Sequence, residues 1–148
     1  MSAPPQQIDA AASNPLEGLL GYQIRRASGA VLASLGKSFA EIGLTVAEGS
    51  IVVLIEANPG VTQSEIGRLL SIKRANMAPL TAGLTAKGLL QRAPADGRSH
   101  RLLLTPEGKT LAAETRRRVA EHEASLCPGA SAEQRRQLAA LLEDIWKG

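Results

Sequence analysis

Residues 62–105 read TQSEIGRLLSIKRANMAPLTAGLTAKGLLQRAPADGRSHRLLLT, and they combine two helix patterns with a hairpin pattern. Its first residues form a capping box, because Thr62 can accept from a free backbone N–H while Glu65 reaches back to the N–H of Thr62. Three apolar residues follow on one face at helical spacing: Ile66, Leu69 and Leu70. The sequence therefore predicts a short helix that begins at Thr62.

A second helix is predicted over Lys73–Lys87, after a short break at Ser71-Ile72. Met77, Leu80 and Leu84 recur on the face that turns inward. Two neighbouring helices with so short a joint are typical of a helix-turn-helix.

A β-hairpin is predicted directly after the second helix. Gly88 is expected to end that helix, because glycine readily adopts the positive φ of a C-terminal cap. Leu89–Arg92 forms one predicted strand and His100–Leu104 the other. Between them, Ala95-Asp96-Gly97-Arg98 contains the Asp-Gly pair that favours a tight turn. A helix-turn-helix followed by a hairpin is a winged helix, here over about residues 45–105.

The region before the winged-helix module (about residues 45–105) is predicted to be helical. Asn14-Pro15 offers a capping asparagine and a proline at the first helical position, which predicts a helix over about 15–38. Its apolar residues recur every three or four positions: Leu16, Leu20, Ile24, Ala27, Val31 and Leu35. A capping box at Thr45 and Glu48 opens another helix, which ends at Asn58-Pro59-Gly60. Residues 1–13 are expected to form a flexible arm.

Two more helices are predicted after the module, over about 105–147. One begins at Thr105-Pro106 and runs to about Leu126, with the stripe Leu111, Thr115, Val119, His122 and Leu126. The other is capped by Ser131 and carries the stripe Leu138, Leu141, Leu142 and Ile145. Because the module cannot cover all these stripes, we expect a homodimer that buries the terminal helices. The predicted fold class is mainly α (α+β), with a single domain over 14–148.

Composition narrows the possible functions. The chain has 148 residues, 44% of them hydrophobic, which is enough for a globular core. Its net charge of +3 permits nucleic-acid binding, while an aromatic content of 2% disfavours the stacking platforms that bind single strands or RNA. No apolar run approaches the length that spans a bilayer, no signal peptide is visible, and one cysteine fits a reducing compartment. We expect a cytoplasmic protein without a membrane partner.

The hairpin resembles a known family. Residues 96–105, DGRSHRLLLT, are similar to the wing signature of MarR-type transcriptional regulators: Asp, any residue, Arg, five residues, then Leu-Thr. Residues 84–90, LTAKGLL, resemble the end of their recognition helix, and the similarity covers about residues 15–147. The resemblance implies a DNA-binding homodimer that joins through its terminal helices.

The start of the second helix is the candidate base reader, because an α-helix fits the major groove and its N-terminal residues reach the base edges. We expect Arg74 to contact guanine, Asn76 to contact adenine, and Ala75 or Pro79 to contact a thymine methyl group. Lys73 belongs to the same set. The alternative is that Lys73 and Arg74 are merely solvated charges.

The wing and the first helix supply the remaining candidates. Arg98 is expected in the minor groove. Three further residues are expected on the hairpin strands near the DNA backbone: Arg92, His100 and Arg101. The resemblance implies that Asp96 holds an arginine by a salt bridge. Phosphate contacts are expected from the start of the first helix, at Gln63 and Ser64.

The resemblance also implies a small effector, often an aromatic carboxylate or related phenolic compound, bound between the dimer helices and the winged module. The candidate contacts are Tyr22, Arg25, Arg26, Phe39 and Leu44, although Arg25 and Arg26 also fit a solvated helix face. Such a ligand would favour a half-site spacing that does not fit the operator.

No enzyme, cofactor or metal site is expected. His122 and Cys127 do not share a helix face well and lack a third ligand, which favours an interface histidine and a structural cysteine. The sequence thus predicts a sequence-specific duplex-DNA-binding regulator, a repressor released by its effector. The alternative is a helical dimer that acts by protein–protein contact through a winged module that does not bind DNA.

Overall fold

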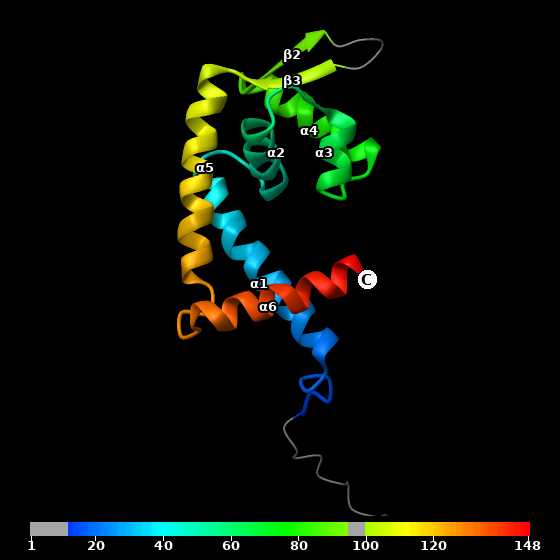
Figure 1. The fold of residues 1–148 in the computed structure, drawn as a ribbon, viewed down its shortest axis with the longest axis vertical. Helices are drawn as coiled ribbons and strands as arrows, with labels where there is room; N and C mark the ends of the chain where they lie inside the picture. Colours follow the sequence, from blue (N-terminus) through cyan, green and yellow to red (C-terminus); the bar gives the residue numbers. More distant parts are fainter. Residues whose placement is uncertain (1–11, 95–99) are drawn as a thin grey trace, which may run out of the picture. The chain divides into compact units, whose positions relative to one another are not determined.

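The computed structural model describes residues 12–94 and 100–148, and Figure 1 shows the path of the chain. Its elements are α1 (Leu20–Ala40), α2 (Val46–Ala57), β1 (Val61–Thr62), α3 (Gln63–Leu69), α4 (Arg74–Ala86), β2 (Leu90–Pro94), β3 (His100–Leu104), α5 (Pro106–Ser125) and α6 (Ala132–Lys147). The predicted class, mainly helical with a small antiparallel sheet, is confirmed.

By its internal packing the chain divides into two units, 1–33 and 34–148, and α1 runs across the boundary between them. The larger unit contains the complete winged module together with α5 and α6. The expected single domain over 14–148 stays a prediction. The expected flexible arm falls almost wholly on residues 1–11, which lie outside the described residues.

The first helix begins at Leu20, so the predicted start at Pro15 is wrong. Asn14 does act as a local cap, because its side-chain oxygen accepts from the N–H of Leu16 at 3.0 Å. Two hydrogen-bonded turns follow, in which Glu17 N–H donates to Asn14 O and Leu19 N–H donates to Leu16 O. These hydrogen bonds reach back three residues, whereas those of an α-helix reach back four. The regular helix therefore begins only after these turns.

The starts of α2, α3, α5 and α6 follow from their capping residues. Thr45 with Glu48, Thr62 with Glu65, and Ser131 with Gln134 each form a complete capping box. The Thr105 hydroxyl accepts from the N–H of Gly108, which caps α5 ahead of a proline in its first turn. All four predicted starts are therefore confirmed, because a cap satisfies donors that no other part of the helix can reach.

The turn between α3 and α4 is tight. Ile72 N–H donates to Gly67 O at 2.8 Å, and Ser71 takes a positive φ of 54°. A Cβ on Gly67 would lie 3.0 Å from Ile72 O and 3.2 Å from Met77 Cγ, which is closer than side chains normally pack. Glycine at this position thus lets the second helix approach the first.

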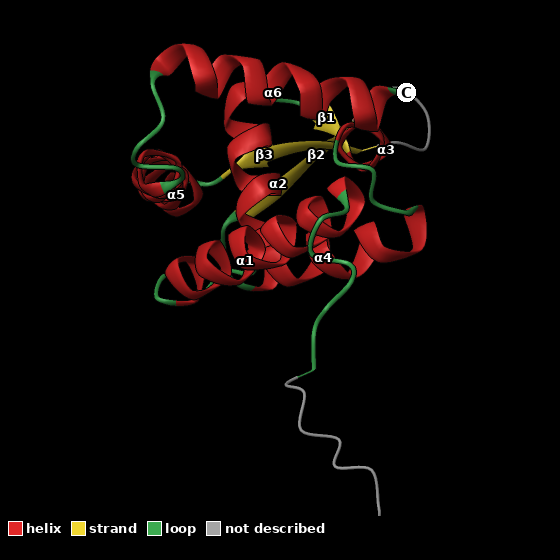
Figure 2. Cartoon of the chain, turned by 90° about the horizontal axis from the view of Figure 1, so that it is seen from below, coloured by secondary structure: helices red, strands yellow, loops and turns green. Residues whose placement is uncertain are grey.

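A three-stranded sheet extends the predicted hairpin, in the order β1-β3-β2 (Figure 2). Strands β2 and β3 are antiparallel, with Leu90 opposite Leu104 and Pro94 opposite His100. The second strand runs to Pro94, two residues beyond the predicted end at Arg92. Strand β1 was not predicted from the sequence, because its two residues are too few to show an alternating pattern.

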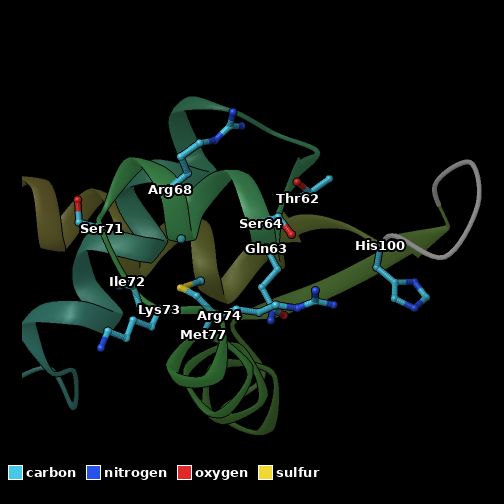
Figure 3. A pocket seen from close by; sticks show the side chains of 11 residues that line it. Thr62, Gln63, Ser64, Arg68, Ser71, Ile72, Lys73, Arg74, Met77 and His100 are labelled. Carbon is cyan, nitrogen blue, oxygen red and sulfur yellow. The ribbon is translucent and has the colours of Figure 1, made fainter.

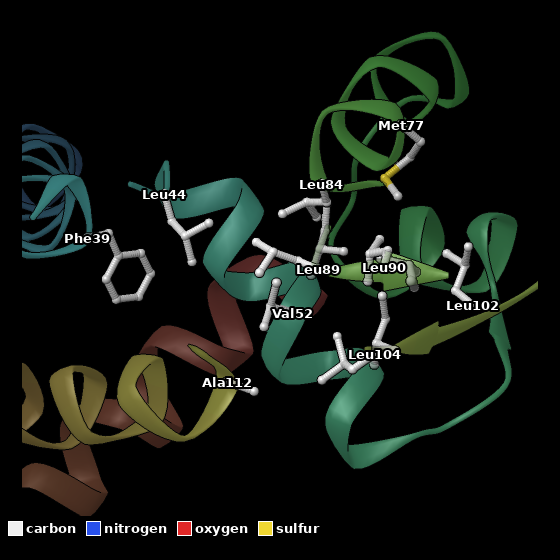
Figure 4. Packing of buried hydrophobic residues seen from close by; sticks show 13 residues of the cluster. Phe39, Leu44, Val52, Met77, Leu84, Leu89, Leu90, Leu102, Leu104 and Ala112 are labelled. Carbon is white, nitrogen blue, oxygen red and sulfur yellow. The ribbon is translucent and has the colours of Figure 1, made fainter. Parts of the chain in front are cut away.

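The hydrophobic core lies in the larger unit (Figure 4). It joins the C-terminal end of α1, helices α2, α3 and α4, the two hairpin strands and one residue of α5. Its buried members are Phe39, Leu44, Ile51, Val52, Ile55, Ile66, Met77, Leu84, Leu89, Leu90, Leu102, Leu104 and Ala112. Met77 and Leu84 are buried as predicted, and Leu80 packs against the cluster. The core therefore holds the recognition helix by its inner face.

The C-terminal helices differ in burial. In α5 the Ala112 and Thr115 side chains are fully buried, whereas no residue of α6 is buried. Because α5 ends at Ser125, Cys127 lies outside the helix, with a φ of 47° and an exposed side chain. None of the helices in the described part of the chain combines the length and apolarity that crossing a bilayer requires.

Candidate nucleic-acid interface

A groove of about 710 Å³ lies where α3, α4 and strand β3 meet (Figure 3). The described residues that line it are Thr62, Gln63, Ser64, Gly67, Arg68, Ser71, Ile72, Lys73, Arg74, Met77 and His100. Among these are three Lys or Arg side chains and no Asp or Glu. The groove can therefore accept a polyanion and offer it several hydrogen-bond donors.

The start of α4 presents its predicted base readers to solvent. Lys73 is the N-cap and Arg74 the first helical residue, and both are exposed. Asn76, Ala75 and Pro79 are exposed as well. A helix of 13 residues with a free outer face has the dimensions that the major groove admits.

The first turn of α3 lies on the wall of the same groove, where Gln63 and Ser64 line it. Glu65 is occupied by the capping box, since it accepts from the backbone N–H and the hydroxyl of Thr62, each at 2.8 Å. These bonds from Thr62 hold the pKa of the Glu65 carboxyl below its usual range. The acid at this helix start is thus satisfied locally.

The wing arginines in the described residues are Arg92 and Arg101, and both side chains are exposed. Arg101 donates from Nη1 to the carbonyl of Gly60 at 3.2 Å, which links β3 to the turn before β1. Arg92 lies within 3.5 Å of the Thr81 hydroxyl on α4. Asp96 and Arg98 lie outside the described residues, so their proposed roles stay predictions.

One basic group of the groove, Arg68, was absent from the predicted contacts, whereas His100 had been expected near the DNA backbone. Arg68 lies four residues after Ser64 on the same face of α3, and His100 begins strand β3. Helical spacing from Ser64 could have identified Arg68. His100 was predicted from its position on the hairpin, but its place beside the start of α3 depends on the pairing of β3 with β1.

The predicted effector contacts fall into two kinds. Phe39 and Leu44 are core residues, 1% and 4% exposed. Arg25 lies over the ring of Tyr22, with 5.2 Å between the guanidinium carbon and the ring centroid, and both Arg25 and Arg26 are exposed. Their role as ligand contacts stays a prediction.

His122 and Cys127 do not form part of a metal cluster in the described residues, where no group of three or more His, Cys, Asp or Glu side chains could hold an ion. The His122 ring nitrogen Nε2 lies 2.6 Å from the Ser34 hydroxyl. This contact joins α5 to the C-terminal part of α1 and gives His122 a structural partner.

A helix-turn-helix with an exposed second helix, a basic groove and an adjoining hairpin defines the winged-helix class of transcriptional regulators. A model of the MarR family matches residues 42–99. The transcriptional repressor CouR, solved with a 23-mer DNA duplex, is 34% identical, with a TM-score of 0.82 over 92% of this chain and 98% of CouR.

Two further comparisons also match transcriptional repressors. CouR bound to p-coumaroyl-CoA is 32% identical, with a TM-score of 0.81 over 92% of this chain and 97% of CouR. An HTH-type transcriptional repressor of Mycobacterium tuberculosis is 25% identical over 128 residues, which cover 85% of this chain and 92% of the repressor. This chain belongs to the MarR family of transcriptional regulators.

Proposed function

We propose that this protein is a homodimeric repressor that binds a pseudo-palindromic duplex operator and is released by a small aromatic effector. The observation that carries the proposal is the basic groove at the start of α4, with Arg74 and Asn76 exposed beside it. Each protomer would place α4 in the major groove of one half-site and its wing against the adjacent minor groove. CouR, similar over nearly its whole length, was solved on a duplex.

The homodimer has support in the exposed apolar side chains of the terminal helices. On α6 these are Leu138, Leu141, Leu142, Ile145 and Trp146, between 38% and 72% exposed. On and before α1 they are Leu16, Leu19, Leu20 and Leu32, between 47% and 71% exposed. An isolated protomer would leave these residues in water, and a second copy could cover them.

For the effector, we propose an aromatic acid or its coenzyme A thioester. One CouR structure contains p-coumaroyl-CoA, which is the thioester of a phenolic acid. In this chain, Arg25 and Arg26 could meet the anionic groups of such a ligand, and Tyr22 its ring. The ligand would release DNA only to the extent that it prefers the dimer state that does not fit the operator.

The DNA-binding proposal is tested by fluorescence anisotropy with the duplex upstream of the protein's own gene and a random duplex as control. Wild type should bind the first duplex specifically, with an affinity that falls steeply as salt rises. Arg74→Ala should lose about 1–3 kcal/mol, or about 5- to 150-fold, and Arg98→Ala should also weaken binding. Arg136→Ala, an exposed arginine on α6, is the matched control and should bind as wild type does.

Equal and weak binding of both duplexes, unchanged in Arg74→Ala, would exclude that promoter as the operator. If a selection from random DNA then enriched no sequence, the DNA-binding proposal would fail. The alternative of a helical dimer that acts through protein contacts would then be the better description.

The effector proposal is tested by adding aromatic acids and their thioesters, p-coumaroyl-CoA among them, to the preformed complex. A thioester effector should release the duplex while free coenzyme A does not. At 100 times its Kd it should stabilise the protein by about 2.7 kcal/mol. Arg25→Ala and Arg26→Ala should weaken this response without altering duplex affinity. If no acid or thioester acts, the proposed effector class is wrong.

A further inference from the structure

Thr81 lies in the middle of the recognition helix, and its side chain is fully buried. It sits on the inner face of α4, one turn from the buried Met77. A buried hydroxyl needs hydrogen-bond partners, because an unpaired polar group in the interior is destabilising. The partners of this hydroxyl come from three different elements.

The first partner is the side chain of Gln63 at the start of α3, whose Oε1 accepts from the Thr81 hydroxyl at 3.0 Å. The second is Arg92 on β2, whose Nη2 donates to the same hydroxyl at 3.5 Å. Within α4, the carbonyl oxygens of Met77 and Ala78 lie 3.1 and 3.2 Å from the hydroxyl oxygen and share its one proton with Gln63. One hydroxyl group therefore lies within hydrogen-bond distance of both helices of the helix-turn-helix and of an arginine of the wing.

This arrangement orients two groups that face outward. The oxygen and the nitrogen of a side-chain amide lie on opposite sides of one carbon, so holding Gln63 Oε1 inward leaves Nε2 free to donate to the groove that Gln63 lines. A guanidinium has five N–H donors, so one inward bond from Arg92 leaves the others for an outside acceptor. Both groups suit the phosphate oxygens of a duplex.

We propose that Thr81 is a positioning residue for operator binding, which fixes the donors of Gln63 and Arg92 toward the DNA backbone. The inference rests on the proposed DNA-binding function. Thr81 is 0% exposed, so it acts through these two side chains and makes no contact with DNA itself. Fixing the donors in advance reduces the rotamer freedom that binding would otherwise remove.

Thr81→Val tests the proposal, because valine keeps the branched shape and removes only the hydroxyl. The Met77 and Ala78 carbonyls can keep their helical N–H partners, so the helix itself should persist. We expect operator Kd, measured by anisotropy, to rise about 3- to 10-fold, corresponding to the loss of one to two hydrogen bonds. Thr81→Ser restores the hydroxyl and should bring Kd back to within about twofold of wild type.

Thr115→Val is the matched control. Thr115 is also fully buried, and its hydroxyl donates to the carbonyl four residues earlier in its own helix, Leu111 O, at 2.7 Å. This control removes an equivalent hydroxyl from α5, away from the groove. Its operator Kd should equal that of wild type.

A double-mutant cycle separates positioning from general stability. Gln63→Ala and Arg92→Ala should each weaken binding strongly in wild type and much less in Thr81→Val, because their donors are no longer fixed. A merely structural role for Thr81 would give additive losses together with a lower Tm, and additivity would overturn the proposal. If Thr81→Val does not fold, Thr81→Ala takes its place in the same cycle.

The outcomes for the two proposals differ. Wild-type binding that is unchanged in Thr81→Val would overturn this inference and leave the repressor proposal intact. A wild type that binds no selected duplex would overturn the repressor proposal and this inference with it.

Discussion

Glu48 joins the start of α2 to the end of the recognition helix. Its Oε2 accepts from Thr45 N–H and its Oε1 from Lys87 Nζ, each at 2.8 Å, while Lys87 also donates to Gly43 O at 2.9 Å. Burial of Glu48 works to raise its pKa, but the bonds from Lys87 and Thr45 outweigh burial, so that the pKa is lowered below 4.5. The carboxylate is therefore stabilised in its charged form.

Glu48→Gln should remove about 1–2 kcal/mol from the free energy of unfolding at pH 7, because it loses a charge-assisted bond to the partly exposed Lys87. A folded pKa below the unfolded value stabilises the protein above about pH 4.5, and this contribution is lost as pH falls through the folded pKa. In urea unfolding, the free energies of unfolding of wild type and variant should differ at pH 7 and converge as the pH is lowered.

Glu123→Gln provides the control for removing one carboxylate, since Glu123 is exposed near the end of α5. It should leave the free energy of unfolding at pH 7 within about 0.5 kcal/mol of wild type. A gap between wild type and Glu48→Gln that persisted undiminished at low pH would contradict the role assigned to the Glu48 carboxylate.

The outer face of α4 offers few polar groups, since Ala75, Pro79, Ala82 and Ala86 are exposed on it. If Ala75 or Pro79 contacts a thymine methyl group, replacing that thymine by deoxyuridine should raise operator Kd about fourfold, the equivalent of about 0.8 kcal/mol for one buried methyl-sized group. Anisotropy with operators substituted one position at a time measures this. Uniform affinity across all substituted half-site positions would show that neither residue reads a methyl group.

At the scale of elements, α5 packs against the base of the wing through a residue without a side chain. A Cβ on Gly108 would overlap the carbonyl oxygen of Leu89, which accepts from Thr105 N–H at 3.1 Å. It would also come within 3.3 Å of Leu104 Cβ. Glycine at 108 thus allows the first turn of α5 to lie directly on the end of β3 and the start of β2.

Gly108→Ala should lower the free energy of unfolding by about 1–3 kcal/mol, because backbone, unlike a flexible side chain, cannot move aside cheaply. Gly36→Ala in α1 is the control, since its Cβ would make an ordinary 3.7 Å contact with Val46. That control should be neutral or stabilising by up to about 1 kcal/mol. Equal stabilities of the two variants in chemical denaturation would refute the close packing at Gly108.

Arg118 on α5 makes a second set of contacts, all of them hydrogen bonds that its guanidinium donates. This arginine donates to Ser38 O at 2.8 Å and to Glu41 at 2.7 Å, and its Nε donates to Glu114 at 2.8 Å. Hydrogen bonds from Arg117 and Arg118 lower the pKa of Glu114 to about 2. The C-terminal end of α1 is thereby attached to α5 by charged groups as well as by packing.

At the scale of the whole molecule, dimerisation decides whether two recognition helices act together. Leu141→Glu places a charge within the exposed apolar face of α6 and should convert the dimer to a monomer in light scattering coupled to size exclusion. Losing the second half-site should weaken operator binding by about 100-fold or more. Ala140→Glu, on the opposite side of α6 by helical spacing, should remain a dimer, and a dimeric Leu141→Glu would contradict the proposed interface.

The sequence predicted the ends of helices correctly where the residues that form the cap are close neighbours in the chain. The capping boxes at Thr45, Thr62 and Ser131 each lie within four residues, and each is present. Gly88 ends the recognition helix with the positive φ expected, 73°. The start of α1 was wrong because Asn14 supports hydrogen-bonded turns as well as it supports a helix.

The order of these elements, and hence the winged-helix class, followed from the sequence alone, because caps, turns and apolar periodicity are interactions between near neighbours. The tertiary structure decided which polar groups meet. Thr81 and Gln63 are 18 residues apart, Glu48 and Lys87 39, and Arg118 and Ser38 80. Such pairs form only after the core has packed α2, α4, α5 and the hairpin together, so the positions of their donors depend on the whole fold.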